Sequence, residues 1–224
     1  MAEQNQILHI YADLETDSFK GTRLIQIAAI TEQGDEFNVF INPQEPLLLP
    51  IINLLGINYY QGQLYRKGLK LESFTAKQAL HQFADWIEQK QQPVILIFHN
   101  GFNFDCKVLI RQFLDHRVKI PSNLIKFGDT LPYFREQIKP PVITNHTLAS
   151  LAAYYNIKQE AAHCALSDSK TLKQICEAHC KGSDIGIMFR TYNRSIQEYL
   201  NNLIWKTPMV KLKALKAAEQ LNKD

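Results

Sequence analysis

The chain has 224 residues, of which 46% are hydrophobic and 21% are charged, and its formal net charge is +3. This length predicts one α/β core with a short appendage, and the mild positive charge favours a polyanionic partner without identifying one. No apolar run approaches the roughly 18 residues of a membrane span, no secretion signal is recognisable at the start, and the four cysteines show no disulfide framework. We therefore expect an intracellular protein, cytoplasmic or nuclear, with no membrane partner.

The first third of the chain predicts a meander of three strands. Residues 7–13, 23–31 and 35–42 are β-rich, with turn residues between them and Asn42-Pro43 after the third. Residues 44–72 are expected to be irregular, and this aromatic-rich segment is open to three interpretations: a substrate wall, a dimer surface or a small satellite core. Ser73 is then expected to cap a helix that places Phe83 and Trp86 on its apolar face.

The remaining segments predict one buried strand followed by helices. The apolar run after Pro93 is short enough for a strand that is buried on both sides, and the helix after Asp105 completes a strand-to-helix crossover. Thr147 and Asp168 are each expected to stand at the start of a further helix. These elements predict an α/β fold with a mixed sheet flanked by helices. Basic residues and amphipathic spacing near the C-terminus predict a helical extension or a charged substrate arm.

Asp13 and Glu15 form the first candidate site. Side chains two apart on a strand point to the same face, so both carboxylates project together while Leu14 points to the opposite side. Two such carboxylates repel each other unless a cation lies between them, and Mg²⁺ or Mn²⁺ prefers oxygen ligands of this kind. Taken alone, the pair is equally typical of surface or capping residues.

Asp105, His163 and Asp168 complete the candidate set. Each stands beside a predicted helix start, where an acidic residue usually caps the helix and an isolated histidine is usually structural. We expect Ser167 to be the better cap of the last helix. The carboxylates nevertheless follow strand one, the buried strand and a late loop, and these are places from which they can converge on one cleft.

As an ordered set, these motifs resemble the DnaQ-like 3′-to-5′ exonucleases of the DEDD superfamily, in the subclass whose third motif is H-x-x-x-x-D. The matching segments are Asp13-Leu14-Glu15-Thr16, His99-Asn100-Gly101 ahead of Phe104-Asp105, His163 with Asp168, and, in support, residues 23–29, Leu55-Gly56-Ile57, Asp129-Thr130-Leu131 and residues 147–151. Within the superfamily, the chain is most similar to the animal three-prime repair exonuclease group, or to relatives that resemble the nuclease-like exon of the promyelocytic leukaemia protein.

This resemblance implies a ribonuclease H-like fold with a mixed five-stranded sheet. It also implies an exonuclease domain over residues 6–180, with residues 181–224 as a helical, basic C-terminal extension. Asp13, Glu15, Asp105 and Asp168 would hold two Mg²⁺ or Mn²⁺ ions about 3.5–4 Å apart, and His163 would act as general base on the attacking water. The implied reaction releases nucleoside monophosphates from DNA 3′ ends, in single-stranded or frayed form, as in DNA repair.

The resemblance also supplies candidates for substrate binding, with the backbone around the first motif meeting the terminal 3′-hydroxyl. The candidates are Leu14, Thr16, Phe19, Ile57, His99 and Phe104. Aromatic stacking contributes about 1–3 kcal/mol per base and tolerates any sequence. Core packing is the alternative for Phe104, and a structural hydrogen bond is the alternative to a phosphate or sugar contact for His99.

Other functions and sites stay open at this point. RNA is the alternative substrate, a nuclease-derived scaffold that binds nucleic acid without cutting it is the non-enzymatic alternative, and a proofreading subunit or a homodimer is compatible with the sequence. Cys176, His179 and Cys180 would supply only three ligands of a tetrahedral zinc site, which disfavours zinc. Asp129 is expected to be a helix cap or a support for the metal ligands rather than a ligand itself.

Overall fold

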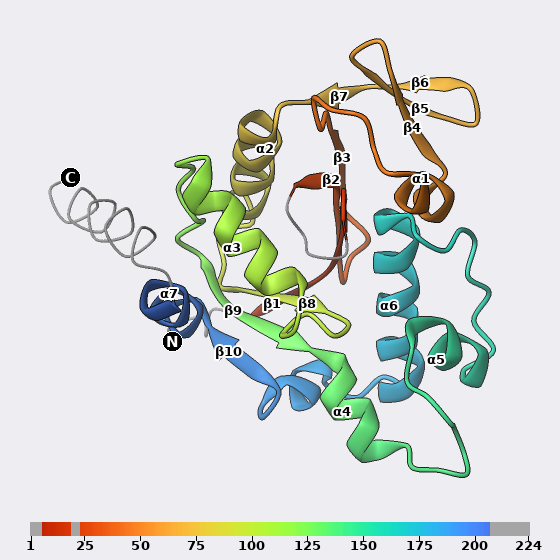
Figure 1. Cartoon of the computed structure of the whole chain (residues 1–224). Coiled ribbons are helices and arrows are strands. Elements are labelled where there is room, and N and C mark those ends of the chain that lie inside the picture. The colour runs from red at the N-terminus through yellow and green to blue at the C-terminus, as the bar shows by residue number, and fades with distance from the viewer. Residues whose placement is uncertain (1–5, 19–22, 207–224) are drawn as a thin grey trace, which may run out of the picture.

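The chain folds into two β-sheets with helices packed against them, as the computed structural model shows (Figure 1). The structure describes residues 6–18 and 23–206. The main sheet contains β1 (Leu8–Thr16), β2 (Leu24–Thr31), β3 (Glu36–Ile41), β7 (Ser73–Phe74), β8 (Val94–Phe98), β9 (Leu124–Asp129) and β10 (Asn193–Ser195), and the small sheet contains β4 (Ile57–Tyr60), β5 (Gln63–Arg66) and β6 (Leu69–Leu71). The helices are α1 (Leu49–Leu55), α2 (Ala76–Glu88), α3 (Asp105–Asp115), α4 (Thr130–Gln137), α5 (Leu148–Tyr154), α6 (Ala165–Cys180), the 3₁₀ helix η1 (Ile185–Phe189) and α7 (Ile196–Lys206).

The main sheet is mixed and confirms the predicted fold class. Its strand order is β10-β9-β8-β1-β2-β3-β7, with the meander β1-β2-β3 antiparallel and β8 parallel to both β1 and β9. The predicted number of five strands is too low for the described residues, because the short strands β7 and β10 extend the two edges. Such short strands carry too few residues for a clear alternation of polar and apolar positions.

Residues 44–72 are regular rather than irregular, which corrects the prediction for this segment. Helix α1 is followed by the small antiparallel sheet β4-β5-β6, whose two turns place Gln61-Gly62 and Lys67-Gly68 at positive φ. Two-residue turns of this kind match the twist of paired strands. Ile25, Leu47 and Leu64 belong to the buried cluster beneath this unit, so of the three interpretations the structure shows a satellite core.

Helices cover both faces of the main sheet, with α2 and α3 on one face and α5 and α6 on the other (Figure 1). Alternation along β1 separates the two sides. Ile10, Ala12 and Leu14 lie in the cluster beneath α2 and α3, whereas Tyr11 lies in the cluster with residues of α6. Since Asp13 shares its face with Tyr11, its carboxylate is directed toward α6.

The starts of the helices differ in part from the predictions. Thr147 caps α5 as predicted, since its hydroxyl accepts the N–H of Ser150. Thr75 caps α2 in place of Ser73, which belongs to β7; Thr75 forms a reciprocal capping box with Gln78. Helix α6 begins at Ala165 with Cys164 as its N-cap. Neither Ser167 nor Asp168 opens that helix, and Asp168 lies in its first turn.

Residues 181–206 continue the same core. Strand β10 pairs with β9, and α7 packs against α3 and β9. Tyr199 of α7 is only 4% exposed and meets Phe127 edge-to-face at 5.3 Å between ring centroids. The helix predicted for the C-terminal extension is present from Ile196 to Lys206, and residues 207–224 lie outside the described residues.

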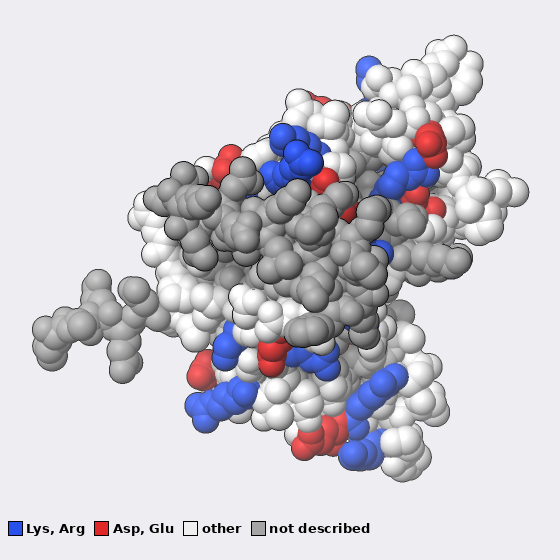
Figure 2. Space-filling model, turned by 60° about the vertical axis from the view of Figure 1, so that its left-hand side comes forward, with Lys and Arg blue, Asp and Glu red and all other residues white. Residues whose placement is uncertain are grey.

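Charged residues are mixed on the described surface. On the face drawn in Figure 2, lysine and arginine lie among aspartate and glutamate in small groups. This mixture agrees with a net charge of only +3. In the part of the chain that the structure describes, none of the helices is long and apolar enough to cross a membrane.

We predict that Tyr199→Ala destabilises the protein, because it removes a buried aromatic ring from the core shared by β9 and α7. The free energy of unfolding should fall by about 3 kcal/mol. Gln197→Ala is the matched control on the same helix, since Gln197 is exposed, and it should change stability by less than about 0.5 kcal/mol. Urea unfolding followed by circular dichroism measures both, and equal stabilities would contradict the packing of α7 on the core.

Candidate active site

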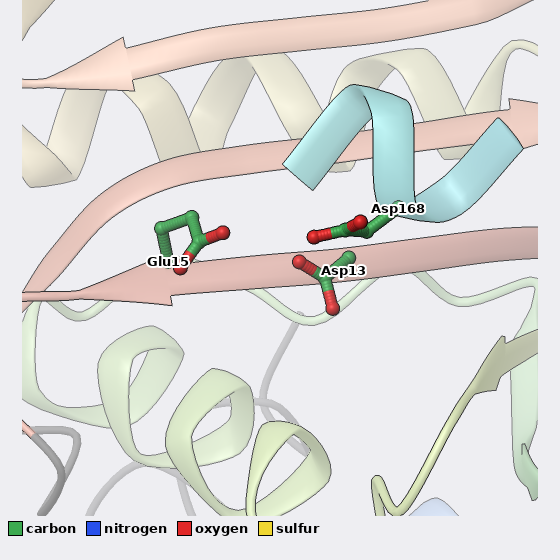
Figure 3. Close-up of side chains that lie close together, drawn as sticks. All are labelled: Asp13, Glu15 and Asp168. Atoms are coloured by element: carbon green, nitrogen blue, oxygen red, sulfur yellow. The ribbon is translucent and has the colours of Figure 1, made fainter. Parts of the chain in front are cut away.

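Three carboxylates from two distant segments meet at the end of β1. Ligand oxygens of Asp13, Glu15 and Asp168 all lie within 4.8 Å of one another. Figure 3 shows Asp13 and Glu15 projecting from β1 toward Asp168, which is carried by α6. The pairing of β1 with β2 shifts register just after Glu15, as at a bulge, which is a common device for aiming a side chain at the end of a strand.

Helix α6 is fixed to the sheet by buried polar contacts. Gln26 lies opposite Glu15 on β2 and is fully buried; its side-chain oxygen accepts the N–H of Ala165 at 3.2 Å, and its side-chain nitrogen donates to Asn38 at 2.8 Å. Ser169 donates its hydroxyl to the carbonyl of Ala28 at 3.3 Å. Because buried polar groups must be paired, these bonds set the height of α6 on the sheet and bring Asp168 to Asp13.

Both carboxylate oxygens of Asp168 are held by donors from the preceding loop. Gln159 donates its side-chain N–H to Oδ1 at 2.6 Å, and the backbone N–H of His163 donates to Oδ2 at 3.0 Å. Asp168 is therefore oriented before any ligand binds. The same bonds tie the loop that carries His163 to α6.

Asp105 approaches the cluster from the opposite face of β1, on the turn between β8 and α3. It is the first residue of α3 and makes no N-cap, since the N-cap position belongs to Phe104. Asp105 is not part of the group within 4.8 Å, yet its charge contributes to the raised pKa of both Asp13 and Glu15. Asp105 thus lies close enough to Asp13 and Glu15 for its charge to act on both.

Asp129 organises the turn that presents Asp105. It is 1% exposed, caps α4 through the N–H of Leu131, and also accepts the backbone N–H groups of Asn100 at 2.8 Å and Phe102 at 2.9 Å. The prediction of a cap or support is therefore confirmed. At Gly101, a Cβ atom would lie 2.4 Å from Cβ of Phe98, so glycine is required there for the turn to pack on the strand.

Burial makes the carboxylates hard to ionise. Burial, followed by the charges of Asp168 and Asp105, raises the pKa of Glu15 to about 8, and burial is also the main reason that the pKa of Asp105 rises to about 7. The pKa of Asp13 is raised well above its usual range by burial and by the charges of Asp105 and Glu15. The pKa of Asp168 is raised by burial, against the opposing hydrogen bonds from Gln159 and His163.

His163 stands at the edge of this cluster. It is exposed and has a φ of 58°, in the left-handed region that non-glycine residues seldom adopt. Its N–H donates to Asp168, and its carbonyl accepts from Arg66 Nη2 at 3.3 Å. The backbone is thus fixed on both sides while the imidazole faces solvent, where it can reach a substrate.

The candidate substrate-binding residues fall in different environments. Leu14 is buried and Thr16 donates its hydroxyl to the carbonyl of Ser18 at 2.7 Å. Phe104 is half-buried against the core, which leaves part of its ring accessible. Ile57 is 0% exposed inside the satellite core, so the prediction that its side chain meets a base is not supported by this structure. Phe19 lies outside the described residues.

Two histidines have both ring nitrogens held by the protein. Those of His99 contact the hydroxyl of Thr130 at 2.8 Å and the carbonyl of His146 at 2.7 Å, so its predicted contact with a phosphate or sugar stays a prediction. Those of His179 contact the hydroxyls of Tyr133 and Tyr155. Both ring nitrogens of His179 are therefore hydrogen-bonded within the aromatic cluster between α4, α5 and α6.

The sequence did not single out Gln26, Gln159 and Arg66, which hold the cluster and its loop in place. Gln26 carried a usable signal, because it is a polar residue inside the apolar run of β2 and so needs a buried partner. Gln159 and Arg66 carried none, since their contacts depend on loop and hairpin geometry.

Comparisons with known proteins agree with this geometry. Residues 10–176 match the family described as exonuclease, of the RNase T type. The chain belongs to this exonuclease family. It is 33% identical over 175 residues to exonuclease DPD1 of Arabidopsis thaliana, named as chloroplastic/mitochondrial, covering 74% of this chain and 54% of the relative. It is 26% identical over 182 residues to a DNA polymerase III PolC-type protein of Pediococcus pentosaceus, covering 79% of this chain and 12% of that protein.

Solved exonuclease structures share the fold. E. coli exonuclease I in complex with a dA16 oligonucleotide aligns with a TM-score of 0.61 at 17% identity, over 89% of this chain and 44% of that one. A 3′-exonuclease that recognises the 3′ end of a histone mRNA stem-loop aligns with a TM-score of 0.55 at 17% identity, over 78% and 80%. The chain thus spans about half the length of the plant relative and less than half of exonuclease I.

The donor set of this exonuclease site fits hard divalent cations. Its ligand atoms are carboxylate oxygens, which Mg²⁺ and Mn²⁺ prefer. Burial raises the pKa of each of the four acids, and the charge of a divalent cation would favour their ionised forms. Members of this family depend on divalent metals.

We predict that the metal-free protein loses stability as pH rises from about 4.5 to 8. Over this range the raised pKa of Glu15 means that the folded state binds more protons than the unfolded chain, so the free energy of unfolding falls with pH. Each extra proton contributes at most about 1.4 kcal/mol per pH unit. Thermal unfolding in chelator at several pH values measures this slope, and a flat or rising melting temperature would contradict it.

Glu15→Gln is the matched variant for this prediction, because it keeps the shape of the side chain and removes the charge. It should flatten the pH slope and raise the melting temperature in chelator at pH 8. Mn²⁺ should raise the melting temperature of the wild type more at pH 8 than at pH 5.5, and it should raise that of the variant less.

Proposed function

We propose that the protein is a divalent-metal-dependent 3′-to-5′ exonuclease that releases nucleoside monophosphates from DNA 3′ ends. The observation that carries this proposal is the convergence of Asp13, Glu15 and Asp168 within 4.8 Å, with Asp105 near enough for its charge to act on Asp13 and with His163 exposed at their edge. Four carboxylates and one histidine in this arrangement supply the ligands and the base that phosphodiester hydrolysis needs. A non-cutting scaffold would not need to retain this buried set of charges.

The protein's own groups have separate tasks in this reaction. The four carboxylates would exchange protons for cations, since burial raises their pKa values and a bound cation favours their ionised forms. When bound, two divalent ions would neutralise charge on the scissile phosphate and on the attacking and leaving oxygens. Water attacks phosphorus, and His163 accepts the proton of the water. The bond to the 3′ oxygen of the preceding nucleotide breaks, and that oxygen takes up a proton from solvent.

DNA is the proposed substrate, in single-stranded or frayed form. The name of the Pediococcus relative refers to a DNA polymerase, and exonuclease I was solved with a DNA oligonucleotide. The histone mRNA exonuclease keeps RNA as the competing substrate to be tested. The finer relationship to the animal three-prime repair exonucleases, and the intracellular compartment, remain proposals based on the sequence motifs.

We also keep the predicted division of the chain, with the exonuclease domain over residues 6–180 and a helical extension from 181, as a proposal. The packing of Tyr199 on Phe127 supports a structural role for the first part of that extension. Residues 181–206 would then complete the core rather than act as a free arm.

We predict shortening of DNA from the 3′ end in Mg²⁺ or Mn²⁺, and none in chelator. The assay compares strands of DNA and RNA, single-stranded and duplex, labelled at the 5′ end, and it identifies the released product by chromatography. A ladder of shortened strands with released nucleoside monophosphates is the expected result. Internal cuts, or cleavage that survives chelator, would overturn the proposal; faster cleavage of RNA would replace DNA as the substrate.

We predict that His163→Ala lowers the cleavage rate by at least about 100-fold, as expected for loss of a general base. Because His163 is exposed, folding and nucleic-acid affinity should change little. His81→Ala is the control, since His81 is exposed on α2, away from β1. Single-turnover cleavage, fluorescence anisotropy and thermal unfolding separate the three effects, and cleavage at the wild-type rate would exclude His163 as the base.

A further inference from the structure

Arg66 joins the small sheet to the loop that carries His163. It lies on β5, and its side chain is on the same face of the small sheet as that of the fully buried Leu64. Its guanidinium donates to three acceptors: the carbonyl of Leu55 at 3.0 Å, the carbonyl of His163 at 3.3 Å and Sγ of Cys164 at 3.2 Å. One side chain thus connects residues that are about a hundred positions apart in sequence.

The contact with Leu55 anchors the guanidinium at the end of α1. Leu55 is the last residue of α1, where carbonyls lack partners within the helix and favour a cation. A planar guanidinium presents several donors in fixed directions. When one edge is bound at the end of α1, the remaining donors are aimed at the His163–Cys164 segment.

The backbone of His163 needs this support. Its left-handed conformation, with φ at 58°, costs about 1–2 kcal/mol for a residue with a side chain. Such a conformation persists only when neighbouring contacts determine it. The N–H of His163 is held by Asp168 and its carbonyl by Arg66, so Arg66 provides the second anchor of this backbone.

We propose that Arg66 is a positioning residue that sets the backbone of His163, and through it the place of the imidazole in the site. This inference rests on the proposed function, because it assigns His163 the role of base. The small sheet β4-β5-β6 then has a role in the reaction, because it carries the residue that positions the general base. Arg66 itself touches neither the carboxylates nor the reacting atoms in this assignment.

A second way for Arg66 to act is through its charge. The pKa of Glu15 is raised mainly by burial and is lowered in part by the charge of Arg66. If charge alone mattered, Arg66→Lys would behave as wild type, and Arg66→Ala would change the affinity for cations. If position matters, lysine replaces arginine poorly because it lacks the planar fork.

The test compares Arg66→Ala, Arg66→Lys and the control Lys70→Ala. Lys70 pairs with Tyr65 and so lies on the outer face of the same small sheet, opposite to Arg66. We expect Arg66→Ala to lower kcat by about 10- to 100-fold, the cost of a misplaced catalytic group, with KM and the Mn²⁺ midpoint changed less than about twofold. Arg66→Lys should recover only part of kcat, and Lys70→Ala should match the wild type.

A double-mutant cycle with His163→Ala decides how Arg66 acts. If Arg66 works through His163, adding Arg66→Ala to His163→Ala should lower the residual single-turnover rate by less than about twofold. An equal loss in both backgrounds, an unchanged kcat in Arg66→Ala, or a comparable loss in Lys70→Ala would overturn the inference. Full recovery by Arg66→Lys, together with a shifted Mn²⁺ midpoint in Arg66→Ala, would assign the effect to charge instead.

Hydrogen exchange provides a measurement that does not depend on cleavage. Amides of residues 159–164 should exchange faster in Arg66→Ala than in Lys70→Ala, while those of α3 stay protected. Unchanged exchange in this loop would refute the role of Arg66 as an anchor of the loop, even if the enzyme is active. If the wild type shows no cleavage sensitive to chelator, the proposed function fails, whereas the exchange result still reports on the anchor.

Discussion

The structure depends on holding like charges together in a buried place. Asp13, Glu15, Asp105 and Asp168 come from β1, α3 and α6, and each pKa is raised because the protein removes water from these groups. Such a cluster opposes folding when it is ionised and metal-free. The surrounding fold must therefore supply stability elsewhere, through the two apolar layers on either face of the main sheet.

Buried polar residues fix the positions of the elements that carry these carboxylates. Gln26 bonds to the first residue of α6. Asp129 accepts two backbone N–H groups of the turn before α3 and one from the first turn of α4. Leaving any of these groups unpaired in the interior would cost about 1–3 kcal/mol. These bonds fix α6 and the turn relative to the sheet, and a shared cation site requires ligands that are held in fixed positions.

The sequence predicted the carboxylates better than their surroundings. Alternation along β1 placed Asp13 and Glu15 on one face correctly, because a strand has a period of two that sequence alone reveals. The burial of Ile57 in the satellite core was not predicted, because the strands of residues 44–72 were not recognised and inward positions could not be assigned. Gln61-Gly62 and Lys67-Gly68 are weaker turn signals than Asn-Gly or Asp-Gly. The number of strands in the main sheet could not be predicted, because its edge strands β7 and β10 are too short to be recognised in the sequence.

The carboxylates and the proposed base are built on different kinds of structure. The acids sit on β1 or in the first turns of α3 and α6, where regular hydrogen bonds prevent movement. His163 sits on a loop and is exposed, with a strained backbone held at its N–H and its carbonyl. Rigid ligands suit a metal site, which must exist before substrate arrives. The side chain of a base must leave room for the end of a nucleic-acid strand to enter and must then contact the attacking water. Because these two anchors hold His163 through its backbone, its imidazole is free to do both.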